Sequence, residues 1–260
     1  MGYWEERQAR SLNKLTDKSI KDVEKELARY YRRTSERVIR EFEYTYEKIL
    51  GAVADNRQPT PADLYKLDKY WQMQGQLQRE LQALGDKQIE YLSKKFVAQY
   101  TEIYEAIALK TDLAFGTMSK ETALQMINTI WCADGKSWSD RVWANTNLLQ
   151  QTLNDSLLDC VIAGKKPSQL KELLQTRFNV SFNNADMLVR TELAHIQTQA
   201  AQQRYKDYGV QEVEIFVDED ERTCPICSKL EGKRYPINGA MPVPVHPRCR
   251  CTVIPVVEVE

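Results

Sequence analysis

The apolar positions of the first fifty residues recur at the spacing of one helix face. Between Ser19 and Leu50 the chain contains no Gly or Pro. Its apolar side chains there repeat mostly at three- and four-residue steps, namely Ile20, Val23, Leu27, Tyr30, Tyr31, Val38, Phe42 and Ile49. This period predicts an amphipathic helix over 19–50, and Gly51 with the polar residues before Pro59 predicts its end.

A second long helical pattern begins at residue 60. Thr60 suits an N-cap, Pro61 suits the first helical position, and Asp63 faces the positive end of the helix dipole. The pattern continues to about Leu113, and Gly85 predicts a break within it. Because these helices are long and rich in Gln and Glu, the sequence favours an extended helical arm or bundle over 1–117.

Shorter helical patterns follow. Ser119 is the cap of one helix, and a helix that follows the next turn ends at Gly164. Between them, Trp131, Trp138 and Trp143 flank an Asp-Gly turn and predict an aromatic plug between helices. We therefore expect a helical body to begin at about residue 118.

The last helices precede a change of period. A short helix is predicted to open at 166–168 and to stop near Phe178, and Asn183 caps a long helix that Gly209 closes. Beyond Gly209 the alternation over 213–217 predicts a strand, and 232–235 and 251–255 supply two further extended pieces. The predicted fold is mainly α, with an arm or bundle at 1–117, a helical body at 118–209 and a small β-rich module at 210–260.

Composition excludes several classes of protein. The chain has 260 residues, of which 28% are charged and 42% hydrophobic, and its net charge is −1. It is therefore not a polycation built to coat nucleic acid. The mean hydropathy is −0.56, and no run of about 18 apolar residues predicts a membrane span.

Five candidate metal ligands lie near the C-terminus. Cys224 and Cys227 form a C-x2-C pair, and His246, Cys249 and Cys251 follow after a turn-rich segment. Such half-sites can complete a tetrahedral zinc shell, and Cys224, Cys227, His246 and Cys249 are the most regular set, with Cys251 able to replace either of the last two. The alternatives are two disulfides or clustered reduced thiols. Because no signal-peptide pattern is present, we expect a structural zinc ion.

One basic stretch is a candidate nucleic-acid contact. Arg29, Arg33, Arg37 and Arg40 share one face of the first predicted helix and lie close to tyrosines. Guanidinium rows of this kind suit phosphate backbones. The alternative is a helix face that pairs with acidic protein side chains, since carboxylates are frequent on both sides of this stretch.

Two features permit an enzymatic interpretation. Glu192 and His195 lie one turn apart on a predicted helix, and residues 218–221 form an acidic run that can hold Mg²⁺. A helix-surface network and a solvated turn explain the same residues. No Ser/His/Asp set, P-loop or dinucleotide fingerprint is present, so we expect no enzyme activity.

Several local patterns together resemble one known family. In chain order they are Trp131-x2-Asp134-Gly135-x2-Trp138-x2-Arg141, Gly164 before Pro167-Ser168, Val189-Arg190-Thr191-Glu192, Asp220-x-Arg222-Thr223-Cys224-x2-Cys227-x4-Gly232-x2-Tyr235, and His246-Pro247-Arg248-Cys249-Arg250-Cys251-Thr252. Over residues 118–256 the chain resembles the minor head proteins of tailed bacteriophages, the Mu F-like head-morphogenesis family. The cysteine pattern is the most specific part of this resemblance.

The resemblance implies a non-enzymatic virion protein of the head interior or portal vertex, made in the host bacterial cytoplasm. It implies incorporation during head assembly, association with the portal protein, and a link to packaged double-stranded DNA or its ejection. Major capsid or scaffolding protein is a further possible partner, and no membrane is implied.

Two other functions are compatible with the residues. One is a zinc-ribbon-type DNA-binding protein with a helical dimerisation arm. The other is a nuclease or transferase that uses Glu192, His195 and residues 218–221. Co-purification with portal protein would favour the head protein. Salt-dependent DNA binding would favour the zinc-ribbon-type protein, and loss of activity on Glu192→Gln would favour the nuclease or transferase.

Overall fold

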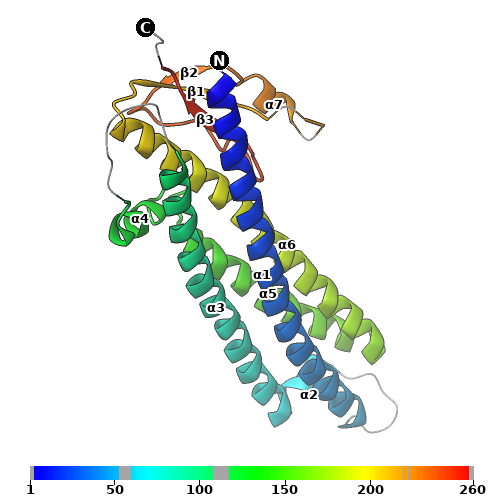
Figure 1. Cartoon of the computed structure of the whole chain (residues 1–260). Coiled ribbons are helices and arrows are strands. Elements are labelled where there is room, and N and C mark those ends of the chain that lie inside the picture. Colours follow the sequence, from blue (N-terminus) through cyan, green and yellow to red (C-terminus); the bar gives the residue numbers. More distant parts are fainter. Residues whose placement is uncertain (1–2, 53–59, 108–116, 219, 222, 258–260) are drawn as a thin grey trace. The chain divides into compact units, whose positions relative to one another are not determined.

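The computed structural model describes residues 3–52, 60–107, 117–218, 220–221 and 223–257. Most of them are helical (Figure 1). The helices are α1 (Tyr3–Ala52), α2 (Pro61–Tyr65), α3 (Asp68–Ala106), α4 (Lys120–Ile127), α5 (Trp138–Ile162), α6 (Pro167–Asp207) and α7 (Pro225–Ser228). The strands are β1 (Glu212–Phe216), β2 (Arg234–Pro236) and β3 (Thr252–Pro255). A mainly helical chain with a small C-terminal sheet is thus confirmed.

Helix α1 is longer than its sequence pattern indicated, since it begins at Tyr3 rather than Ser19. Its predicted apolar stripe is buried, with Val23 and Leu27 fully inaccessible and Phe42 1% exposed. Burial of this stripe favours the bundle over the arm as the state of these helices. No helix in the described ranges is long and apolar enough to cross a membrane.

The predicted start of the second helical pattern is confirmed at α2. The backbone N–H and the hydroxyl of Thr60 both donate to a carboxylate oxygen of Asp63, at 2.9 and 2.7 Å. The backbone N–H of Asp63 donates in return to the Thr60 hydroxyl. These reciprocal bonds form a capping box, which satisfies donors that a helix N-terminus leaves unpaired.

The predicted break at Gly85 is wrong, because α3 continues through this residue. A Cβ atom at Gly85 would lie 2.3 Å from Cζ3 of Trp143, which is far inside van der Waals contact. The glycine therefore makes room for the indole ring of α5, and close packing outweighs its low helix propensity.

The predicted interruption between Phe178 and Asn183 is also wrong, because α6 is one helix of 41 residues. Side chains of α1 and α5 contact the segment between Phe178 and Asn183. The Ser181 hydroxyl lies 3.2 Å from the Tyr31 hydroxyl, and the Asn145 side chain donates to the Ser181 carbonyl oxygen at 2.8 Å. Such contacts stabilise a helix whose local residues are weak helix formers.

The sheet has the order β2-β1-β3, and both pairings are antiparallel. Gly209 adopts a φ of +78°, which ends α6 as predicted and allows the chain to turn into β1. Phe216 of β1 and Ile254 of β3 form a small buried cluster with Ala9 of α1. The sheet thus shares its core with a helix that is far away in sequence.

The chain divides into two compact units. The first contains Met1–Glu24, Tyr91–Trp138 and Met187–Glu260, and the second contains Lys25–Glu90 and Ser139–Asp186. Both the sheet and the cysteine-rich segment belong to the first unit. The sequence ranges 1–117, 118–209 and 210–260 stay a prediction of functional division.

Candidate metal centre and its supports

The five predicted ligands lie in the first unit on two turns and the start of a strand. Cys224 is the N-cap of α7, Cys227 lies within this helix, and Pro225 at the first helical position tightens the turn. His246 and Cys249 lie on a second turn, which is closed by a 3.1 Å backbone bond from Cys249 N–H to the His246 carbonyl oxygen. Cys251 directly precedes β3.

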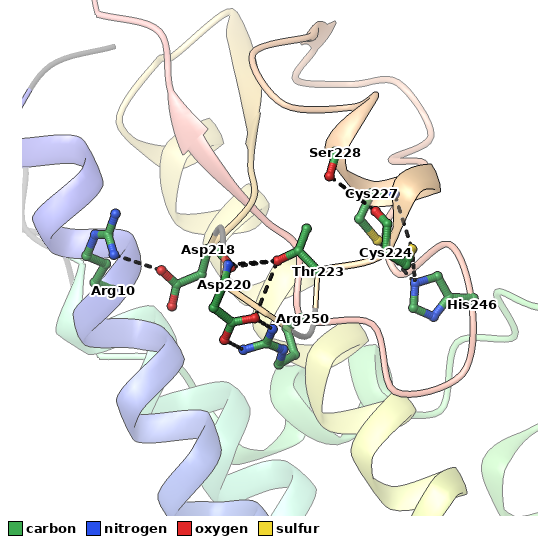
Figure 2. A network of polar contacts seen from close by, with 9 residues as sticks. All are labelled: Arg10, Asp218, Asp220, Thr223, Cys224, Cys227, Ser228, His246 and Arg250. Atoms are coloured by element: carbon green, nitrogen blue, oxygen red, sulfur yellow. Dashed lines mark hydrogen bonds and ion pairs between the residues drawn. The ribbon is translucent and has the colours of Figure 1, made fainter.

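The structure brings all five donor groups together. His246 Nε2 lies 3.2 Å from Cys224 Sγ and 3.1 Å from Cys227 Sγ, and Figure 2 shows the ring facing both cysteines. The Sγ atoms of Cys227 and Cys249 are 3.8 Å apart. Cys227, Cys249 and Cys251 form a second group whose donor atoms lie within 4.8 Å of one another. Cys227 is therefore common to both groups.

The Cys227–Cys249 separation equals that expected in a tetrahedral zinc shell, whereas the two thiol–imidazole separations are shorter, and Cys249 is not in the same group of donor atoms as Cys224 and His246. With Zn–S bonds of about 2.3 Å, two thiolates on one ion lie about 3.8 Å apart, and a thiolate and an imidazole nitrogen lie about 3.5 Å apart. All six cysteines are free thiols, so the alternative of two disulfides is not the arrangement observed.

Hydrogen bonds favour a thiolate in each half of the cluster. The backbone N–H of Cys227 donates to Cys224 Sγ at 3.4 Å and lowers the pKa of Cys224 to about 7. A hydrogen bond with Cys251 lowers the pKa of Cys249 to about 5, and the same contact raises the pKa of Cys251. A metal ligand must be deprotonated, which the shifts at Cys224 and Cys249 favour, whereas burial raises the pKa of Cys227 to about 12.

The tautomer of His246 is set by its own turn. Its Nδ1 lies 2.9 Å from the carbonyl oxygen of Pro247, and this contact raises the pKa of the ring. A carbonyl oxygen only accepts, so Nδ1 carries the proton and Nε2 keeps its lone pair. The lone pair faces the thiols, which is the usual orientation of a metal-binding histidine.

The acidic run before Cys224 is engaged in ion pairs. Asp218 accepts from the Arg10 guanidinium at 2.8 Å, and Asp220 accepts from Arg250 through two bonds of 2.8 and 2.5 Å (Figure 2). The Thr223 hydroxyl donates to the Asp218 carbonyl oxygen and accepts from the Asp220 N–H. Two carboxylates of the predicted Mg²⁺ cluster thus hold the cysteine turn in place, and Glu219 lies outside the described residues.

Glu192 and His195 both contact Trp131. The indole N–H of Trp131 donates to Glu192 at 3.1 Å, and the indole ring stacks on the imidazole with centroids 4.1 Å apart. Burial lowers the pKa of His195 to about 4, and neither ring nitrogen has a hydrogen-bond partner among the described residues. The pair is therefore packed around an indole ring and is not arranged as an acid and a base.

Three consecutive residues of α6 connect three segments of the first unit. Arg190 pairs with Glu24 of α1 at 2.8 Å, and Glu192 accepts from the Trp131 loop. Between them, the Thr191 hydroxyl accepts from the backbone N–H of Arg248 at 3.1 Å. Arg248 belongs to the turn that carries His246 and Cys249. The sequence contains each of these motifs but does not predict that they lie side by side, because only the fold brings the segments together.

The predicted nucleic-acid face lies on α1 in the second unit. Arg33 and Arg40 are exposed. Arg29 pairs with Glu26, and Arg37 pairs with Glu80 at 2.7 Å. Two of the four guanidinium groups thus interact with protein carboxylates, as the alternative interpretation expected, and DNA contact by this face stays a prediction.

Comparison with known proteins identifies the region that carries the cluster. Residues 151–254 match the family model described as Phage Mu protein F like protein. The match includes α6 and all five candidate ligands. Searches of curated proteins and of solved structures returned no match. Residues 151–254 are therefore similar to the Mu F-like family of phage head-morphogenesis proteins.

Proposed function

We propose that the protein is a non-enzymatic minor component of a phage head, incorporated during assembly at the portal vertex. The observation that carries this proposal is the family match over the region that gathers the five donor groups. Portal protein is the proposed principal partner, with major capsid or scaffolding protein as a further neighbour. Packaged duplex DNA and its ejection are the process that the protein would serve.

The polar residues of the first unit support a structural role. The carboxylates of Asp218 and Asp220 accept from arginines, and Glu192 accepts from an indole N–H. General acid–base catalysis needs such groups within reach of a substrate. Their occupation by internal partners favours assembly over catalysis as the function of this unit.

We further propose that the C-terminal module (residues 210–257) holds one structural zinc ion. The proposed ligands are Cys224, Cys227, His246 and Cys249, because they form the most regular pair of half-sites in the sequence and Cys227 is common to the two groups of donor atoms. A closed shell of this kind supplies cross-linking and leaves no position for a reactive water. Cys251 lies beside Cys249 as a supporting thiol.

The ligand set is tested by two matched serine variants. Cys249→Ser removes a proposed ligand, and Cys251→Ser removes its neighbour two residues away. We expect the first to lower zinc content and weaken zinc retention during dialysis against a mild chelator, and the second to keep about one zinc per chain. The opposite order would assign Cys251 as the fourth ligand and refute the proposed set.

The head function is tested in the virion. Heads assembled without this protein should form at normal yield but lose DNA retention or infectivity, and tagged protein should co-purify with portal protein from assembling heads. A Glu192→Gln variant provides the control for catalysis, since it should act only through folding. Full infectivity without the protein, or substrate cleavage by purified protein that depends on Glu192, would overturn the proposal.

A further inference from the structure

Five cations form a regular line along the first turns of α1. Arg7, Arg10, Lys14, Lys18 and Lys21 follow one another at steps of three, four, four and three residues, and every one of them is exposed. This spacing keeps them on one helix face, because an α-helix has 3.6 residues per turn. We call these five residues the cationic stripe. They belong to the first unit and lie in the dark blue part of α1 in Figure 1.

The centre of the stripe is not neutralised within the protein. Lys14, Lys18 and Lys21 have no ion-pair partner among the residues that the structure describes. Two acids that follow on α1 are committed elsewhere, since Asp22 pairs with Lys95 at 3.7 Å and Glu24 pairs with Arg190 at 2.8 Å. The exposed carboxylate of Asp17 lies one turn from Lys14 and from Lys21, so three exposed ammonium groups outnumber one exposed carboxylate in this part of the stripe.

The two arginines at the N-terminal end of the stripe are fixed in position. The Arg10 guanidinium pairs with Asp218 and lies 5.5 Å from the centre of the Phe216 ring. The guanidinium of Arg7 lies 5.6 Å from the centre of the Trp4 ring. Asp218 offsets the charge of Arg10, so Arg7, Lys14, Lys18 and Lys21 are the cations of the stripe that are available to a ligand.

We propose that the cationic stripe binds the phosphate backbone of duplex DNA. From Arg7 to Lys21 the helix rises about 21 Å at 1.5 Å per residue, which is the length of about six base pairs at 3.4 Å each. The stripe thus places a row of cations beside a row of backbone phosphates. The chain has no aromatic residue between Arg7 and Lys21, so the stripe provides no stacking platform of the kind that single strands require.

The surface suits DNA better than an acidic protein. Lysine ammonium groups are strongly hydrated point charges without fixed geometry, and they suit a sequence-independent polyanion more than defined carboxylate pairs. The inference rests on the proposed head function only for the source of the duplex, which is packaged DNA. The proposed binding site is inferred from the residues of α1 alone.

Binding of a random 30-base-pair duplex at several salt concentrations tests the proposal. The test variant is Lys14→Gln, Lys18→Gln and Lys21→Gln, with Arg10 retained because it holds Asp218. The control variant removes three dispersed exposed lysines, Lys87, Lys120 and Lys166, and therefore changes net charge equally. A third variant, Arg33→Gln with Arg40→Gln, tests the exposed part of the arginine face.

We expect the stripe variant to bind about 10- to 100-fold more weakly at 50 mM salt, and the slope of log K against log salt to decrease by about 2 to 3, because three phosphate contacts are lost. The dispersed-lysine control should keep the parent slope. An equal loss in both variants, an unchanged slope in the stripe variant, or tighter binding to polyglutamate than to the duplex would overturn the proposal.

Circular dichroism and zinc content of each variant exclude misfolding as the cause. Incorporation of the stripe variant into heads separates the two proposals. A variant that enters heads normally but fails to bind DNA supports both of them. A variant that enters heads and binds DNA as the parent does would refute the stripe and leave the head function intact.

Discussion

In the second unit, helices are held together by large apolar side chains, whereas the C-terminal module gathers five candidate metal ligands. Phe42, Tyr46 and Leu81 are almost fully buried, and burial of one such side chain contributes about 1.5–3 kcal/mol. The module has strands of five, three and four residues. Segments this short bury little apolar area of their own, so we expect the proposed zinc ion to contribute much of their order. The difference predicts that the two regions will fail under different treatments.

Metal removal should have the largest effect and should separate the regions most clearly. Structural zinc contributes about 10 kcal/mol or more to the folding of small zinc domains. After treatment with a strong chelator, we expect amide hydrogen exchange over residues 223–251 to become fast while residues 139–162 stay protected. The same protection pattern before and after chelation would show that the module is held by its packing alone.

Acidification should destabilise the first unit through His195. The pKa of this histidine is about 4 in the folded state, against about 6.5 in the unfolded state. Between these values the unfolded state binds a proton that the folded state does not, so stability decreases as pH falls from 6.5 towards 4. The contribution is on the order of 3 kcal/mol.

The variant His195→Phe keeps a ring against Trp131 and removes the titration. Urea unfolding of this variant should show a weaker pH dependence between pH 6.5 and 4 than the parent, since the proposed zinc site is the same in both proteins. Parallel pH profiles for the two proteins would show that His195 is not held neutral.

A methyl group should be enough to disturb the second unit. Ala is the better helix former by about 1 kcal/mol, yet Gly85→Ala places a Cβ atom within 2.3 Å of the Trp143 ring. We expect a net loss of about 1–3 kcal/mol in the free energy of unfolding, since overpacking forces the ring to move. Zinc content should not change. A stabilised variant would mean that the ring relaxes at no cost.

The smallest effect on stability is expected at the contact between α6 and the turn that carries His246 and Cys249. Thr191→Val keeps the shape of the side chain and removes the acceptor for the Arg248 N–H, a bond worth about 0.5–1.5 kcal/mol. We expect faster exchange of the Arg248 amide with zinc still bound. Unchanged exchange at Arg248 would show that the ion alone positions the turn.

Local signals in the sequence were reliable where the chemistry is local. The capping box at Thr60 and the left-handed glycine at Gly209 depend on neighbouring residues, and both were predicted. Gly85 and the segment between Phe178 and Asn183 misled because their environment comes from distant segments: an indole ring at Gly85 and a tyrosine hydroxyl at Ser181. Propensity carries no information about such contacts.

The same distinction applies to the candidate site. The spacing of Cys224, Cys227, His246 and Cys249 predicted their convergence, because turns bring nearby residues together. The Thr191–Arg248 bond and the ion pair of Arg10 with Asp218 join segments 57 and 208 residues apart. The cationic stripe was present in the sequence as a 3-4-4-3 spacing, but only the structure shows that Asp22 and Glu24 pair with cations outside it.

X-ray absorption at the zinc edge tests the central claim most directly. Protein purified without chelator should contain about one zinc per chain, and its absorption fine structure should fit three sulfur ligands at about 2.3 Å and one nitrogen at about 2.0 Å. His246→Cys should convert this shell to four sulfurs and so confirm the assigned nitrogen. Protein without zinc, or a parent shell that already fits four sulfurs, would contradict the proposed centre.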